Sequence, residues 1–129
     1  MPEELIKTIE EHLNSDDLEI VCNECIEKIA NLNIGISAVK QLIEMLERNP
    51  LADAEPWAVI HYIESFGEYD DILYESVKRS PTLQTVYLLK RICNVSECPE
   101  KFRKLLIETA ERKDIDKEIS ALATEFAES

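Results

Sequence analysis

Apolar residues recur at every third or fourth position along most of the chain, the spacing that places them on one face of an α-helix. This periodicity predicts about eight short amphipathic helices, at residues 3–13, 17–32, 38–48, 56–66, 70–79, 82–94, 99–112 and 116–127. Residues that favour helix ends lie between them. We expect Asp16, Ser37 and Ser96 to cap N-termini, Pro56, Pro81 and Pro99 to lie near first turns, and Gly67 to end a helix.

The odd-numbered helices of this series resemble one another in sequence. Residues 42–50 (LIEMLERNP) match residues 73–81 (LYESVKRSP), and weaker matches recur around residues 5–10 and 108–112. Repeats of 30 to 40 residues with two helices each are typical of an α-solenoid. The sequence therefore predicts a single all-α domain, residues 1–129, of four stacked helical hairpins resembling degenerate HEAT repeats. A globular bundle of eight helices is the alternative.

The composition agrees with helices and adds a strong negative charge. Two glycines among 129 residues disfavour β-hairpins, and 27 acidic against 14 basic residues give a net charge of −13, spread along the whole chain. Such a surface repels nucleic acid and anionic lipid and attracts cationic partners, although solubility alone would also explain it. Without a signal peptide or an apolar run of about 20 residues, a cytoplasmic protein without membrane contact is expected.

Four cysteines could in principle form a zinc site, since Cys22 and Cys25 form a C-x-x-C and Cys93 and Cys98 a C-x4-C. Helical spacing favours core packing, because Cys22, Cys25 and Cys93 fall on the apolar faces of their helices. No phosphate-binding loop, nucleophile elbow or histidine-based metal motif is present. We therefore expect no enzymatic activity, no cofactor and no bound metal; a zinc or redox protein is the weaker alternative.

A candidate binding surface follows from the fourth helix, where Trp57, His61 and Glu64 share one face and Val59 and Ile63 the opposite one. Either Trp57 is exposed as an interface anchor, or it is buried by the connector of residues 50–54 or by a neighbouring hairpin. The sixth helix has a matching outer face, and such second helices line the concave side of a solenoid. The predicted partner-binding residues are Trp57, His61, Glu64, Glu68, Tyr69, Asp70, Asp71, Tyr87 and Arg91.

The same region resembles a known protein family. The stretch PWAVIHYIESF at residues 56–66 is followed by Tyr74, Ser76, Arg79, Pro81, Thr82, Thr85, Val86, Leu89, Arg91 and Asn94. This pattern is similar to all-helical immunity proteins of bacterial polymorphic toxin systems, including contact-dependent growth inhibition. The resemblance marks five characteristic polar positions, which serve either as scaffold or as toxin contacts: His61, Glu64, Arg79, Arg91 and Asn94.

The resemblance implies a cytoplasmic protein that binds and blocks one cognate toxin, often a nuclease. Because nucleases carry basic clefts for phosphate backbones, an acidic protein could occlude such a cleft without catalysis. The alternative function is a HEAT-like adaptor or self-associating interaction domain without a toxin partner.

Overall fold

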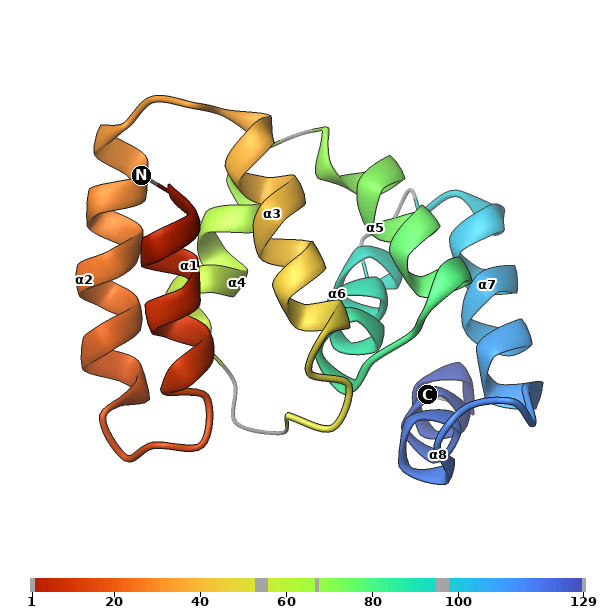
Figure 1. Cartoon of the computed structure of the whole chain (residues 1–129). Coiled ribbons are helices and arrows are strands. Elements are labelled where there is room, and N and C mark those ends of the chain that lie inside the picture. Colours follow the sequence, from red (N-terminus) through yellow and green to blue (C-terminus); the bar gives the residue numbers. More distant parts are fainter. Residues whose placement is uncertain (1, 53–55, 67, 95–97, 129) are drawn as a thin grey trace.

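The computed structural model describes residues 2–52, 56–66, 68–94 and 98–128. Within them the chain is all-helical, without strands, which confirms the predicted fold class (Figure 1). The eight helices are α1 (Pro2–Glu11), α2 (Leu18–Asn31), α3 (Ile36–Glu47), α4 (Trp57–Glu64), α5 (Tyr69–Arg79), α6 (Leu83–Cys93), α7 (Glu100–Glu111) and α8 (Lys117–Glu128). Every helix lies within two residues of its predicted bounds.

The predicted helix caps are less accurate than the helices. Gly35, at a φ of 61°, precedes α3, and Ser37 lies within its first turn. Asp17 takes the N-cap position of α2 in place of Asp16, without a side-chain capping bond. Glycine reaches positive φ at little steric cost, which explains why the chain turns at Gly35. Ser96 and Gly67 lie outside the described residues.

The helices pack as hairpins in two rows. Each helix contacts its successor within the pairs α1–α2, α3–α4, α5–α6 and α7–α8, while α1, α3, α5 and α7 contact one another in that order. Among the even helices, α2 packs on α4 and α6 on α8. Figure 1 shows this progression from the α1–α2 end to the α7–α8 end. The arrangement agrees with the predicted stacking of hairpins.

Arginine side chains join consecutive odd helices at equivalent positions. Arg48, after α3, donates two hydrogen bonds to Glu10 of α1, at 3.0 and 3.2 Å. Arg79, at the end of α5, donates two to Glu47 of α3, at 2.7 and 3.1 Å. Arg112, after α7, donates a hydrogen bond to a main-chain carbonyl of α5 that lies 34 residues earlier in the chain. These contacts recur at the period of the sequence repeat and show Arg79 in a structural ion pair.

One apolar core runs through all the helices, and three of the four cysteines belong to it. Cys22, Cys25 and Cys93 are buried, as their spacing predicted, while Cys98 is half-buried. Burial raises the pKa of the Cys22 thiol to about 11. Burial and the neighbouring Cys98 together raise the pKa of the Cys93 thiol to about 11 as well. Both thiols are therefore protonated at neutral pH. The described part of the chain contains no group of three or more potential metal ligands.

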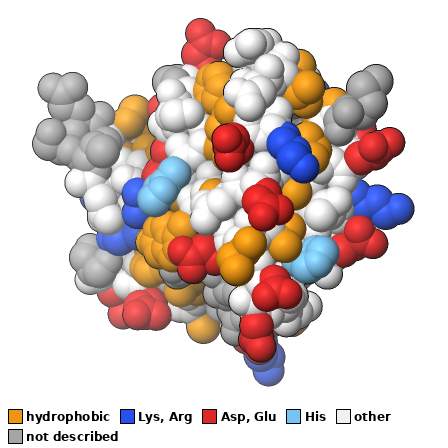
Figure 2. Space-filling view, turned by 90° about the vertical axis from the view of Figure 1, so that its left-hand side faces the viewer, with side chains coloured by type: hydrophobic (Ala, Val, Ile, Leu, Met, Phe, Trp, Pro, Cys, Tyr) orange, Lys and Arg blue, Asp and Glu red, His pale blue; other side chains and the backbone are white. Residues whose placement is uncertain are grey.

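Acidic side chains are dispersed over the face of the molecule shown in Figure 2. Figure 2 shows the α1–α2 end, where carboxylates are scattered among exposed hydrophobic groups. Among the described large apolar residues, Ile20 on α2 is the most exposed, at 62%. None of the helices in the described ranges has the length and apolar character needed to span a membrane.

Candidate partner-binding surface

Helix α4 directs Trp57 outward. Val59 and Ile63 on its opposite face are fully buried, as is Ile60, whereas Trp57 is 41% exposed. One turn further along, His61 lies beside the indole, with ring centroids 5.6 Å apart. Of the two alternatives for Trp57, the structure therefore selects the exposed side chain.

Helices α6 and α8 extend this surface with further rings. Tyr87 of α6 meets Trp57 edge to face, with centroids 6.0 Å apart and planes at 80°. The ring centroid of Phe126 in α8 lies 6.4 Å from that of Tyr87. We call His61, Trp57, Tyr87 and Phe126 the aromatic row. Phe126 was not predicted, although its place four residues after Leu122 on an amphipathic helix was the available signal.

The start of α6, which positions Tyr87, is fixed by a buried capping box. The Thr82 hydroxyl accepts the main-chain N–H of Thr85, and the Thr85 hydroxyl accepts that of Thr82, both at 3.0 Å. The Gln84 side-chain amide also donates to the carbonyl of Ala52, at 3.0 Å. The described part of the connector after α3 thus anchors the start of α6. The capping box was not predicted either, because it uses threonine at both positions.

An ion pair joins α4 to α6 beside the aromatic row. Arg91 donates two hydrogen bonds to the Glu64 carboxylate, at 2.5 and 2.9 Å, and its guanidinium carbon lies 5.8 Å from the centre of the Tyr87 ring. The bonds to Glu64 raise the pKa of Arg91 further above its usual value. This geometry gives Glu64 and Arg91, both half-buried, a structural role that fixes the spacing of the two helices.

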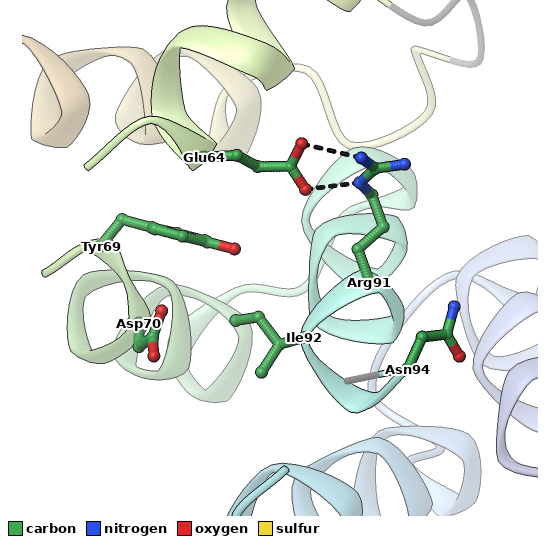
Figure 3. A pocket seen from close by; sticks show the side chains of 6 residues that line it. All are labelled: Glu64, Tyr69, Asp70, Arg91, Ile92 and Asn94. Atoms are coloured by element: carbon green, nitrogen blue, oxygen red, sulfur yellow. Dashed lines mark hydrogen bonds and ion pairs between the residues drawn. The ribbon is translucent and has the colours of Figure 1, made fainter. Parts of the chain in front are cut away.

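A pocket of about 510 Å³ opens next to this ion pair, and six side chains line it (Figure 3): Glu64, Tyr69, Asp70, Arg91, Ile92 and Asn94. Tyr69 was predicted as a partner-binding residue, but it is only 9% exposed because its ring packs into the core at the start of α5. In Figure 3 its hydroxyl points toward the pocket residues of α6. Burial, with smaller effects of Glu64 and Asp70, raises the pKa of Tyr69 to about 12.

The remaining predicted acids surround a second depression, of about 550 Å³, lined by Glu68, Asp70 and Asp71 together with Lys101 of α7. Asp71 forms an exposed ion pair with Lys101, at 3.4 Å. Asp70 borders both hollows, so the predicted positions form one continuous surface running from α4 and α6 to the start of α5. Tyr69 lies beneath that surface, and the other eight contribute to it.

No protein-family model, curated protein or solved structure matches this chain. The interpretation of the surface therefore depends on its own geometry and charge.

Proposed function

We propose that this protein binds and neutralises a basic partner protein, most specifically a toxin domain of the nuclease type. The observation that carries this proposal is the partly exposed Trp57, held edge to face against Tyr87 with ring centroids 6.0 Å apart. Tryptophan and tyrosine in such pre-positioned clusters dominate the binding energy of many interfaces. The resemblance of residues 56–94 to immunity proteins supports a toxin as the partner.

Electrostatics would act mainly on the rate of encounter. A net charge of −13 attracts a cationic protein over several ångströms, while the aromatic row provides short-range contact area. Inhibition would be steric, with the acidic surface occupying a cleft that otherwise takes a phosphate backbone. This mechanism requires no catalysis, cofactor, nucleic acid or membrane contact.

Self-association is a second candidate function, and one feature favours it. Helix α2 ends one side of the stack. Its Ile20 is 62% exposed, and Leu32, directly after the helix, is 43% exposed. Two copies could cover these side chains by packing end to end. Such contact would leave the aromatic row free.

Capture experiments in the source strain test the proposal when three baits are compared: wild type, Trp57→Ala and Ile107→Ala. Ile107 is the matched control, because it is 48% exposed and lies on α7, a helix that contributes no ring to the aromatic row. We expect a basic protein that wild type and Ile107→Ala retain and Trp57→Ala loses. The purified partner should lose its toxic or nuclease activity on complex formation.

Rate measurements complete the test. Association with that partner should slow about tenfold between low and physiological salt, with a smaller change in dissociation. An acidic partner, or a partner that stays fully active in the complex, would contradict neutralisation. A homodimer broken by Ile20→Glu, with no other protein captured, would support self-association instead.

A further inference from the structure

The pocket beside the Glu64–Arg91 ion pair contains a tyrosine hydroxyl for which no hydrogen bond is found within the described ranges. The Tyr69 residue as a whole is 91% buried, but its hydroxyl oxygen stays accessible from the pocket, into which it is directed (Figure 3). The hydroxyl is therefore available to a group entering from outside.

The charges lining the pocket select the kind of group that fits. Arg91 directs two of its donors at Glu64, so these two side chains neutralise each other. The Asp70 carboxylate has no ion-pair partner in the described part of the chain, while the neighbouring Asp71 pairs with Lys101. One negative charge is left over in the pocket.

The environment of Asp70 supports this reading. Burial is the main cause that raises its pKa, and the charge of Asp71 adds to the effect, while Lys101 opposes it. A carboxylate in this position gains from a cation placed beside it. An anion would instead have to face Asp70 and Glu64.

We propose that this pocket receives a lysine or arginine side chain of the partner protein, with Asp70 as its counter-ion and the Tyr69 hydroxyl as a hydrogen-bond acceptor. Ammonium and guanidinium groups offer several donors and no acceptor, which suits both atoms. The inference rests on the proposed function, since it names the partner group that enters this surface. The pocket adjoins the aromatic row, because Arg91 contacts both Glu64 and Tyr87.

Titration of the ¹⁵N-labelled protein with N-acetyl-arginine methylamide, followed by NMR, tests the pocket without a partner. We expect saturable shifts at the amides of Tyr69, Asp70, Arg91 and Asn94. The matching citrulline compound, which has the same shape but no charge, should give no saturable shifts. In wild type, saturation with the arginine compound should also lower the pKa of the Asp70 carboxyl, measured by ¹³C NMR; an unchanged pKa would overturn the proposal.

Two isosteric variants separate the pocket from general acidity. Asp70→Asn should weaken binding of the arginine compound about tenfold, as expected for the loss of a charge-assisted contact. Asp71→Asn removes the same charge one residue away, at a side chain that is 86% exposed, and should change affinity less than about twofold. Tyr69→Phe should weaken binding about threefold. Equal effects of the two Asp variants, each shown to be folded by its NMR spectrum, would overturn the proposal.

The same pair of variants distinguishes this inference from the proposed function. If a basic toxin is captured and neutralised equally well by Asp70→Asn and Asp71→Asn, the pocket assignment is wrong and neutralisation stands. If the arginine compound binds in an Asp70-dependent way but the strain yields no basic partner, the pocket assignment stands and neutralisation is wrong.

Discussion

Replacing Trp57 with alanine separates what the indole does for this protein from what it would do for a partner. The ring contacts His61 and Tyr87 at centroid distances of 5.6 and 6.0 Å, and 41% of the residue stays exposed. The covered part contributes to folding. The exposed part is available for binding.

The magnitudes of both effects follow from the exposed fraction. A large aromatic side chain buries about 150–250 Å² when fully enclosed. With 41% exposed, about three-fifths is already covered, roughly 90–150 Å², or about 2–4 kcal/mol at about 25 cal/mol/Å². Because unfolded chains already bury some area and alanine keeps a methyl group, we expect a loss of about 2 kcal/mol in the free energy of unfolding. The exposed remainder, roughly 60–100 Å², predicts about ten- to seventyfold weaker partner binding.

The assays must measure the two quantities independently. Urea unfolding followed by far-UV circular dichroism gives the stability of wild type and Trp57→Ala, and calorimetry with the captured partner gives affinity. Trp57 is the only tryptophan, so fluorescence of the wild type reports directly on this surface. Partner binding should shift its emission to shorter wavelength and reduce quenching by acrylamide.

Two results would refute this reasoning. A loss of stability above about 4 kcal/mol, with full affinity retained by the folded variant, would make Trp57 a core residue. Unchanged emission and quenching on complex formation would place the interface elsewhere on the molecule.

Three further predictions concern contacts within the fold. Arg91→Met and Glu64→Gln should show a coupling of about 1 kcal/mol in a double-mutant cycle of unfolding free energies, because the pair is bidentate but partly exposed; a coupling near zero would contradict a scaffold role. Ser76→Ala should leave stability unchanged or raise it by up to about 1 kcal/mol, since the buried Ser76 hydroxyl has no partner in the described residues; a clear loss would reveal an unseen hydrogen bond. Burial raises the pKa of the Cys22 thiol from 9.0 to about 11, so the thiol of the unfolded state loses its proton at lower pH than that of the folded state. The urea midpoint of unfolding should therefore fall as pH rises from 9 to 11, and Cys22→Ala should flatten that decline.

The helices were predictable because their signals are local. The spacing of Leu18, Cys22 and Cys25 by itself places these three side chains on one helical face, and all three are buried. Helix ends were less predictable, because several residues near an end can serve as a cap. At α3 the backbone turn at Gly35 decided the boundary, although Ser37 has the better capping side chain.

Part of the candidate surface was also set within single helices. Trp57 and His61 lie four residues apart and therefore face the same way, and the repeat placed Tyr87 on the next equivalent helix. Tertiary structure decided the rest: that Trp57 is exposed, that Arg91 is bonded to Glu64 27 residues earlier, and that Phe126 completes the aromatic row. It also decided that Tyr69 is buried while its neighbour Asp70 lines a pocket. Helical periodicity fixes the angle between side chains on one helix, but the rotation and offset of one helix against another depend on how side chains from distant segments pack together.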